Sequence, residues 1–498
     1  MPRQRPLLRP STLLLAAATL ALGGCANGEE TSASVGSETS ATTTATTATT
    51  ATGPMPTSAG TDDAKTDATT GSTTTGGTTG STTGETTEAT TDATTGTTGT
   101  TGSTGATDSD SDSGTTTGGD LTDEELLLLA IEGELDPADA LQQISDSDGL
   151  PIAGEGGTYY FACLCGPGTW SLVGDFNGWA PLAMNEAGAL RWVELEIAAP
   201  DGAKYKFVDN VDVYIPDPMA RRYDYDAFGE FSLVRASAPH LERWFNVAGF
   251  GLEPRDLQVY VPQDGLFSHA IYAADGQNLF DPDAIWGGWK LQESVPPEML
   301  IVGVDNTPAR MDEYTHVTDV IQKMTVGGKG PDYAKLVHEQ IRPRMEAAYG
   351  EPLTSAVMGS SLGGLISFVI ADLYPDDYDM VISMSGTVGW GSIGDGVNNP
   401  TILEIYEQAG KRPFAIYLDS GGGDGGMPCV DSDLDGIDDD DLAASDNYCE
   451  NNQLRDALAG LGYTFDLDLW HWWEPDAPHN EAAWAARVGM PLTHFAGL

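Results

Sequence analysis

The sequence predicts a doubly wound α/β domain with a mostly parallel sheet over residues 250–498, preceded by a small antiparallel β-sandwich over residues 157–235. Two observations predict the larger domain. After residue 254, short apolar runs alternate with helix-compatible segments, and a Gly-x-Ser-x-Gly turn separates one such run from the next helix. The sandwich is predicted by brief alternating runs between turn residues.

Residues 1–24 have the pattern of a lipoprotein signal peptide. Three arginines precede an apolar stretch, which ends in Leu-Gly-Gly just before Cys25. Cleavage there would leave Cys25 with a lipid on its sulfur, and we therefore expect an exported chain anchored to a bacterial membrane or cell surface. An uncleaved anchor is the alternative, but the apolar stretch is too short to span a bilayer comfortably.

Residues 25–119 consist mostly of Thr, Ala, Gly, Ser and Asp, which predicts a disordered tether. Residues 120–150 predict a short helical spacer with acidic residues in its first turn. No later stretch is long and apolar enough to cross a bilayer, so membrane contact is expected through the lipid alone. The net charge of -52 argues against nucleic acid as a partner, because phosphate binding needs the opposite sign.

The apolar runs after a predicted linker at 236–254 are typical of strands in a sheet buried on both faces. These runs are 257–261, 270–273, 299–304, 355–358, 380–383, 414–418 and 465–470. The helical stretches between them are 332–349, 365–373, 401–409 and 453–462. This alternation predicts parallel strands joined by helical crossovers.

The turn Gly359-Ser360-Ser361-Leu362-Gly363 follows one of these apolar runs directly and opens a helix. In such a nucleophile elbow the serine occupies a strained turn, and the residues two before and two after it must be small so that strand and helix can approach. Ser361 is therefore the candidate nucleophile. An ordinary Gly/Ser loop is the alternative interpretation.

A serine hydroxyl needs a base to take its proton and an acid to orient that base. Three histidines follow the elbow: His471, His479 and His494. His479 is the expected base because it lies after the final predicted strand and before a helix. His471 lies among the aromatic residues of that strand, and His494 lies near the end of the sequence.

The acid should follow the strand at 414–418. Asp424 is favoured because its glycine-rich turn lets a carboxylate fold back, and Asp419 at the strand end is the alternative. Ser361, Asp424 and His479 then follow the chain order of an α/β hydrolase. The backbone N–H of Leu362 is expected to donate to the oxyanion, with a second donor on the loop after an early strand.

Two segments resemble known families. Residues 172–179, Leu-Val-Gly-Asp-Phe-Asn-Gly-Trp, are similar to the early-set, glycogen-binding type of immunoglobulin-like sandwich. Trp170, Trp179 and Trp192 lie in this segment. The resemblance implies that they either stack on sugar rings or pack as core or interdomain aromatic residues, and both roles are open here.

The second resemblance covers 256–491 and is to the esterase D-like family, which includes enterochelin, feruloyl and acetyl-xylan esterases and mycolyltransferases. It rests on Arg255 to Pro262, Ala274 to Phe280, Ile301 to Asn306, Gly359 to Gly364 and His479 to Trp484. The resemblance implies that the backbone N–H of Gln277 is the second oxyanion donor and that the chemistry needs no cofactor. It also implies a small-molecule or oligosaccharide ester as substrate.

Because an early-set sandwich before such a domain looks like certain secreted carbohydrate esterases, acyl groups on carbohydrate are the leading expectation. A siderophore esterase is the alternative enzyme. An alternative of another class is a noncatalytic glycan-binding surface protein.

The insert after Asp424 departs from that family. Its carboxylates at Asp431, Asp433, Asp435 and Asp439 flank Gly436, and the pattern resembles the thrombospondin type 3 calcium loop. It lacks the glutamate that ends an EF-hand loop, so we expect a structural Ca²⁺ of the former kind, with a solvated acidic loop as the alternative.

The cysteines other than Cys25 would meet an oxidising compartment after export. Cys429 and Cys449 are predicted to pair because they bracket the acidic insert. Cys163 and Cys165 are separated by one residue, so a mutual bridge would be strained, and their state is left open.

Overall fold

The computed structural model describes residues 121–394, 396–426, 428–440 and 445–498. The predicted signal peptide, the lipidation site at Cys25 and the predicted tether lie outside these residues. Within the described ranges, no helix combines the length and the apolar character that crossing a membrane requires.

Two helices, rather than one spacer, precede the first strands: α2 (Asp123–Glu132) and α3 (Pro137–Asp146). Thr122 and Glu125 form a capping box at the start of α2, and the Asp136 side chain caps α3. The apolar faces of both helices pack on one side of the first sheet. The residues that share this core include Leu127, Leu141, Ile144, Ile152, Ala162 and Leu190.

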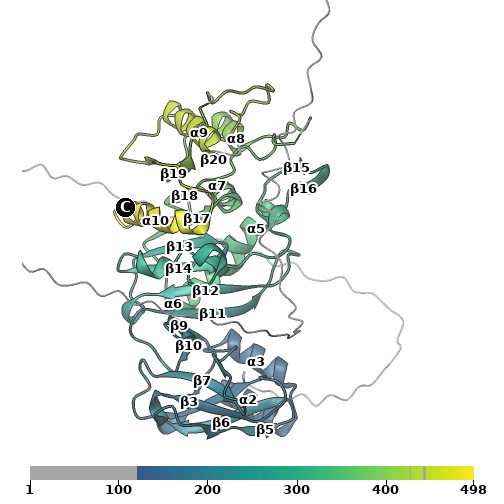
Figure 1. The fold of residues 1–498 in the computed structure, drawn as a ribbon, viewed down its shortest axis with the longest axis vertical. Helices are drawn as coiled ribbons and strands as arrows, with labels where there is room; N and C mark the ends of the chain where they lie inside the picture. Colours follow the sequence, from purple (N-terminus) through teal and green to yellow (C-terminus); the bar gives the residue numbers. More distant parts are fainter. Residues whose placement is uncertain (1–120, 395, 427, 441–444) are drawn as a thin grey trace, which may run out of the picture. The chain divides into compact units, whose positions relative to one another are not determined.

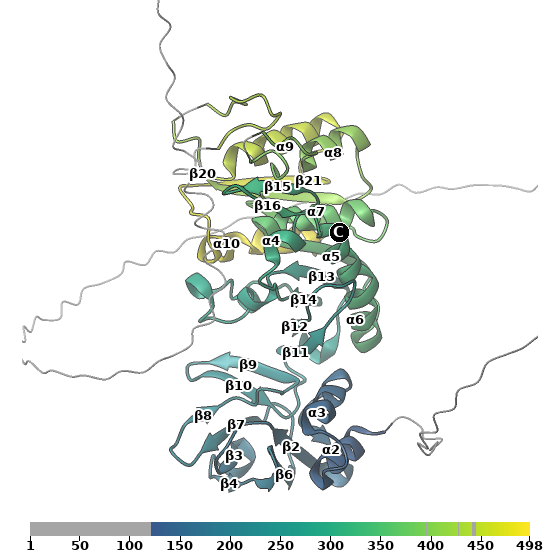
Figure 2. The same cartoon turned by 90° about the vertical axis from the view of Figure 1, so that its right-hand side faces the viewer.

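Two antiparallel layers of strands follow, of which the first is a sheet of its own and the second is one end of the large 15-stranded sheet (Figure 2). The first has the order β1 (Ile152–Ala153), β2 (Thr158–Cys163), β6 (Leu190–Glu196) and β5 (Asn185–Ala187). The second has the order β9 (Arg222–Asp226), β10 (Gly229–Leu233), β7 (Lys204–Asp209), β3 (Trp170–Gly174) and β4 (Leu182–Ala183), with β8 (Tyr214–Ile215) on β7.

Aromatic residues of both sheets, among them Phe161, Tyr205 and Phe207, form the core between them. Trp170 and Trp192 pack against buried clusters, whereas Trp179 is more exposed. The early-set assignment stays a prediction.

The predicted linker at 236–254 is wrong, because it contains strand β11 (His240–Val247). This strand pairs antiparallel with β9 on one side and with β12 (Arg255–Val261) on the other. The charged residues Glu242 and Arg243 hide the strand in the sequence. In the fold they have partners, since Glu242 pairs with Arg222 at 3.2 Å and Arg243 pairs with Glu230 at 3.0 Å.

The main sheet confirms the predicted doubly wound, mostly parallel architecture (Figure 1). Strand β12 is antiparallel to its neighbours β11 and β14, and the strands from β14 to β21 run parallel. Their order is β12, β14 (Met299–Val304), β13 (His269–Ala274), β17 (Thr354–Ser360), β18 (Met380–Met384), β19 (Ala415–Gly422) and β21 (Leu469–Pro475). The short strand β20 (Ser445–Asp446) returns antiparallel to the end of β19.

Successive strand residues enter two different cores, which explains the continuous apolar runs. In β17, Ala356 and Met358 pack on one side with residues of α10 (Glu481–Arg487) and α11 (Gly489–Phe495). Val357 packs on the other side with residues of α7 (Leu362–Leu373), α8 (Ile402–Ala409) and α9 (Tyr448–Gly460). Helices α8 and α9 lie side by side there (Figure 2).

The predicted helix at 332–349 is a continuous helical segment of three parts, α5 (Gly330–Lys335), a π-helical stretch η8 (Leu336–Ile341) and α6 (Arg342–Tyr349). A hairpin of β15 (Thr318–Ile321) and β16 (Met324–Gly327) lies before it and was not predicted. The remaining short elements are η2 (Glu155–Gly157), η3 (Asp175–Asn177), η4 (Gln263–Gly265), η5 (Gly276–Asn278), η6 (Ile285–Gly287), η7 (Leu291–Glu293) and α4 (Arg310–Glu313).

Candidate active site

The turn between β17 and α7 has the geometry that its sequence predicts. Ser361 has φ 56° and ψ -124°, a strained conformation for a residue with a side chain. A Cβ atom on Gly359 would lie 2.8 Å from Gly363 Cα, and one on Gly363 would lie 3.2 Å from Ala274 Cβ. Gly359 therefore lets β17 and α7 meet around Ser361, and Gly363 lets the start of α7 approach the end of β13.

The loop after β18 surrounds Ser361. The Ser361 N–H donates to Met384 O at 3.0 Å, and the Thr387 N–H donates to Ser361 O at 3.1 Å. Ser361 Oγ lies 3.5 Å from Thr387 Oγ1, at the outer limit of a hydrogen bond. Among the described residues, no hydrogen bond joins Ser361 Oγ to His479. Such contacts are often long in a free enzyme and tighten only when substrate binds.

His479 lies between β21 and α10, as predicted. The next residue, Asn480, accepts a hydrogen bond from Ala483 N at 3.0 Å and so caps α10. The His479 ring packs edge-on against Trp484, with ring centroids 4.9 Å apart. Its Nδ1 atom hydrogen-bonds Asp446 Oδ1. The imidazole is thus held between an aromatic ring and a buried carboxylate.

Three donors hold the second carboxylate oxygen of Asp446. The Ser385 hydroxyl donates to Oδ2 at 2.6 Å, the Gly421 N–H at 2.7 Å and Arg487 Nη2 at 3.1 Å. Burial raises the pKa of Asp446, but the hydrogen bond and charge of His479, followed by those of Ser385 and Arg487, outweigh it, and the net pKa lies below the ordinary value. Asp446 is therefore an ionised carboxylate near neutral pH.

The prediction that Asp424 orients His479 is wrong in this structure. Asp424 Oδ1 accepts a hydrogen bond from Gly426 N at 2.8 Å on the exposed side of its own turn. Within the described ranges, Asp424 makes no bond to His479. The alternative, Asp419, is fully buried but pairs with Arg487 at 3.0 Å instead.

Asp446 reaches His479 because the chain returns to β19 after the acidic insert. Strand β20 sets Asp446 opposite Gly421 and Ser445 opposite Gly422, at the carboxyl end of β19. A Cβ atom on Gly421 would lie 2.6 Å from Asp446 Oδ2, so this position favours glycine. The sequence did not lead us to Asp446. The one feature that could have pointed to it is its position just before the helix that follows the insert.

The loop after β13 is fixed against the start of α7. Asp275 adopts a left-handed conformation with φ 60°, and Arg310 holds its carboxylate with two bonds of 2.7 Å. Asn306 Nδ2 also donates to Asp275, at 2.6 Å. A Cβ atom on Gly363 would lie 3.3 Å from Asp275 Oδ2. The loop that carries Gln277 therefore packs on the turn of the candidate nucleophile.

In the described part of the chain, neither the Gln277 N–H nor the Leu362 N–H has a protein acceptor. Gln277 is itself held in place, because its Oε1 accepts a hydrogen bond from Asn306 N at 3.0 Å. Free N–H groups on two fixed loops are what an oxyanion site requires. Their role stays a prediction.

Three of the four predicted calcium ligands come together. Carboxylate oxygens of Asp431, Asp433 and Asp435 all lie within 4.8 Å of one another, which suits the oxygen ligands that Ca²⁺ prefers. Burial, followed by the neighbouring carboxylates, raises the pKa of Asp435. Asp439 does not belong to this group, and its Oδ2 accepts a hydrogen bond from Ser432 N at 2.8 Å.

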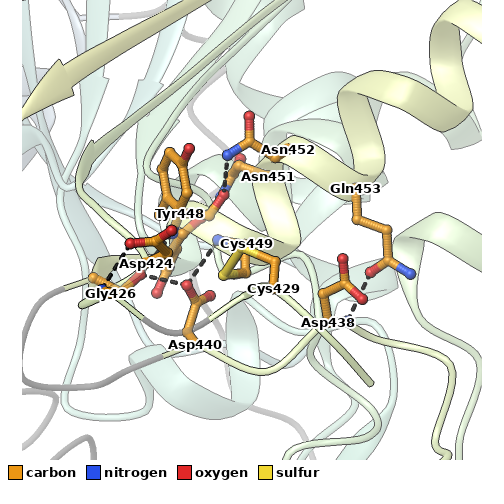
Figure 3. The surroundings of a disulfide bond; sticks show 12 residues. Asp424, Gly426, Cys429, Asp438, Asp440, Tyr448, Cys449, Asn451, Asn452 and Gln453 are labelled. Carbon is orange, nitrogen blue, oxygen red and sulfur yellow. Dashed lines mark hydrogen bonds between the residues drawn. A yellow bond between two sulfur atoms is a disulfide. The ribbon is translucent and has the colours of Figure 1, made fainter. Parts of the chain in front are cut away.

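A disulfide joins Cys429 to Cys449, with Cα atoms 5.3 Å apart (Figure 3). Beside it, Asp440 Oδ1 accepts a hydrogen bond from Cys449 N at 2.7 Å. The bridge thus connects the insert to the first turn of α9, three residues after Asp446. In the sandwich, Cys163 and Cys165, whose state the sequence left open, are also bonded, with Cα atoms 5.2 Å apart.

Comparison with known proteins supports the fold assignment. Residues 253–487 match the family described as "Putative esterase". The uncharacterized protein YbbA of Bacillus subtilis is 28% identical over 153 residues, which cover 29% of this chain and 61% of that relative.

Solved structures with similarity include three hydrolases. The enterobactin esterase FES of Shigella flexneri has 14% identity and a TM-score of 0.37, covering 68% of this chain and 93% of its own. An IroE-like serine hydrolase of Shewanella oneidensis has 16% identity and a TM-score of 0.38, covering 51% and 79%. The siderophore hydrolase EstA of Aspergillus nidulans has 14% identity and a TM-score of 0.39, covering 52% and 94%.

At TM-scores below 0.5, none of these likenesses decides the substrate. The family match and the parallel sheet with its strained serine turn cover the same residues. Residues 253–487 therefore belong to the esterase family of α/β hydrolases.

Proposed function

We propose that this protein is an exported, lipid-anchored serine esterase that hydrolyses carboxylic esters through an acyl-enzyme on Ser361. The observation that carries the proposal is the buried Asp446 bonded to His479, in an esterase-family domain whose Ser361 occupies a strained elbow. Export and lipid attachment at Cys25 are supported by the sequence pattern of residues 1–25.

In this mechanism the three side chains divide the work of proton transfer. His479 Nε2 takes the proton of Ser361 as Oγ attacks the ester carbonyl, while Nδ1–H donates to Asp446. The N–H groups of Leu362 and Gln277 donate hydrogen bonds to the carbonyl oxygen as negative charge develops on it. His479 then returns the proton to the departing alcohol, and water releases the acid from Ser361 by the same steps.

For the substrate we propose acyl groups on small or oligomeric carbohydrates. The support is the sequence of the preceding sandwich, whose Trp179 is partly exposed. The chemistry itself needs a serine, a base and an acid, which the chain supplies without a cofactor.

The test is hydrolysis of p-nitrophenyl acetate, methyl ferulate, acetylated xylo-oligosaccharides and a catecholate siderophore lactone by the full-length protein. We expect turnover of the acyl-sugar esters, and a loss of at least about 10³-fold in kcat for Ser361→Ala. Turnover of the siderophore lactone alone would replace the carbohydrate assignment by the siderophore one. Equal rates for wild type and Ser361→Ala would leave a noncatalytic glycan-binding protein.

We also propose that Asp431, Asp433 and Asp435 bind one structural Ca²⁺. Adding Ca²⁺ at about a hundred times its Kd is expected to stabilise the folded form by about 2.7 kcal/mol, which a rise in the melting temperature would report. The matched control is Asp433→Asn, which removes one ligand charge and should weaken the response. A melting temperature that is indifferent to both EDTA and Ca²⁺ would refute this site.

A further inference from the structure

The side chain of Arg487, at the end of α10, lies between two buried aspartates. Its Nε donates to Asp419 Oδ2 at 3.0 Å, and its Nη2 donates to Asp419 Oδ1 at 3.1 Å. The same Nη2 donates to Asp446 Oδ2 at 3.1 Å. The side chain of Arg487 is 3% exposed, and those of Asp419 and Asp446 are 0% exposed. Asp446 is therefore linked through one guanidinium to a second carboxylate on β19.

Ser385 completes this network. Its hydroxyl accepts hydrogen bonds from Arg487 Nη2 at 2.6 Å and from Trp484 Nε1 at 3.0 Å, and donates to Asp446 Oδ2 at 2.6 Å. One donor and two acceptor positions are all that a hydroxyl offers, so its hydrogen-bonding capacity is filled. The Ser385 N–H also donates to Asp419 Oδ1 at 3.0 Å. Arg487 Nη2 shares its two hydrogens among Ser385, Asp419 and Asp446, and a buried network of this kind fixes the position of its members.

We propose that Arg487 is a positioning residue that holds Asp446 through its Oδ2 atom, with Asp419 as the counter-ion of the guanidinium. The inference rests on the proposed function, because it assigns a task to residues behind His479. Burial raises the pKa of Asp419 and the charge and hydrogen bonds of Arg487 oppose that rise. With both carboxylates ionised, the two aspartates and the guanidinium carry one net negative charge beside the imidazole. Arg487 therefore fixes the orientation of the Asp446 carboxylate toward His479 and sets the net charge behind the imidazole.

The charges around His479 make the proposal measurable. The titratable and charged groups on the packed elements are Asp446 on β20, Asp419 on β19, Arg487 and Glu481 on α10, and Asp440 on the insert, which interacts with Asp446. Burial raises the pKa of Glu481 and that of Asp440. Removing Arg487 leaves a more negative surrounding that favours the imidazolium, so the base loses its proton at higher pH. Removing the charge of Asp419 has the opposite effect.

The experiment measures kcat, KM and the pH dependence of kcat/KM, whose acid limb is the rise in activity as the base loses its proton. The variants are Arg487→Met, Arg487→Lys, Asp419→Asn and the double variant Arg487→Met/Asp419→Asn. For Arg487→Met we expect kcat to fall about 10- to 100-fold, because the acid is misplaced, with KM little changed. Its acid limb should move to higher pH by about one unit, and that of Asp419→Asn should move to lower pH. The double variant and Arg487→Lys should return the limb toward that of wild type.

The matched control is Arg243→Met, which breaks a mostly buried arginine–glutamate pair between β11 and β10. It should lower the melting temperature without moving the acid limb. Shifts of the same sign in Arg487→Met and Asp419→Asn, or wild-type kcat and limb in Arg487→Met, would overturn the proposal. If Arg487→Met does not fold, the other two single variants test the proposal. A lower-pH acid limb in Asp419→Asn with an unshifted limb in Arg487→Lys would support it, and any other pair of results would overturn it.

The two proposals fail separately. Full activity of Ser361→Ala would remove the proposed function and this inference together. An inactive Ser361→Ala beside an Arg487→Met enzyme with wild-type kcat and acid limb would remove only the role of Arg487.

Discussion

Asp446→Asn is expected to lower kcat by roughly 10³- to 10⁴-fold. Three donors surround Asp446 Oδ2, namely the Ser385 hydroxyl, the Gly421 N–H and Arg487. An asparagine would keep its carbonyl oxygen there, since an NH₂ group would face three other donors. Its NH₂ would then point at His479 Nδ1 and force the proton onto Nε2. The imidazole would be unable to take a proton from Ser361, and steady-state hydrolysis of p-nitrophenyl acetate would show the loss.

The control for this prediction is Asp424→Asn, which changes an exposed carboxylate in the neighbouring turn. We expect its kcat to stay within about twofold of wild type, as for surface substitutions in general. An Asp446→Asn enzyme that keeps a tenth of its activity, or an Asp424→Asn enzyme that loses most of it, would contradict the assignment of Asp446.

Removing the disulfide of the acidic insert is expected to cost about 3 kcal/mol of stability, the amount that a closed loop of this length typically contributes. The double variant Cys429→Ser/Cys449→Ser frees the chain between β19 and the first turn of α9. Asp446, which bonds to His479, lies three residues before Cys449, so in the proposed mechanism this region also positions Asp446. We therefore expect a lower melting temperature together with a lower kcat.

Cys163→Ser/Cys165→Ser is the matched control, because it removes the bridge of the sandwich and touches none of the active-site residues. It should lower the melting temperature and leave kcat at the wild-type level. Wild-type kcat in Cys429→Ser/Cys449→Ser would show that the insert does not position Asp446.

Much of the esterase domain could be predicted from local sequence. The strands at its centre are buried on both faces, so each appears as an unbroken apolar run such as 299–304. The elbow was predictable because close packing requires glycine at 359 and favours it at 363. The position of His479 was predictable because the sequence places it after the last apolar run and before a helix.

The elements that could not be predicted from the sequence contain polar residues whose partners come close only in the folded chain. Strand β11 was hidden by Glu242 and Arg243, which are neutralised across the sheet. Helix α9 begins at Tyr448, five residues before its predicted start, because the polar Glu450 and Asn451 of its first turns are buried. The Glu450 carboxylate accepts a hydrogen bond from Gly389 N at 2.6 Å.

Asp446 was missed for a related reason. The insert offers many aspartates, and local sequence gives no sign of which one a return strand brings opposite Gly421. Its partners, Ser385 and Arg487, lie 61 and 41 residues away in the chain, so no local pattern connects them.

The central claim is that Ser361 carries the acyl group, and trapping that intermediate tests it most directly. The full-length protein is mixed with p-nitrophenyl acetate, quenched with acid during the initial burst, and digested for mass spectrometry. We predict one acetyl group per protein on the peptide that contains Ser361, and none in Ser361→Ala. Undiminished hydrolysis by Ser361→Ala, or acetylation of another residue with the kinetics of the burst, would contradict the account.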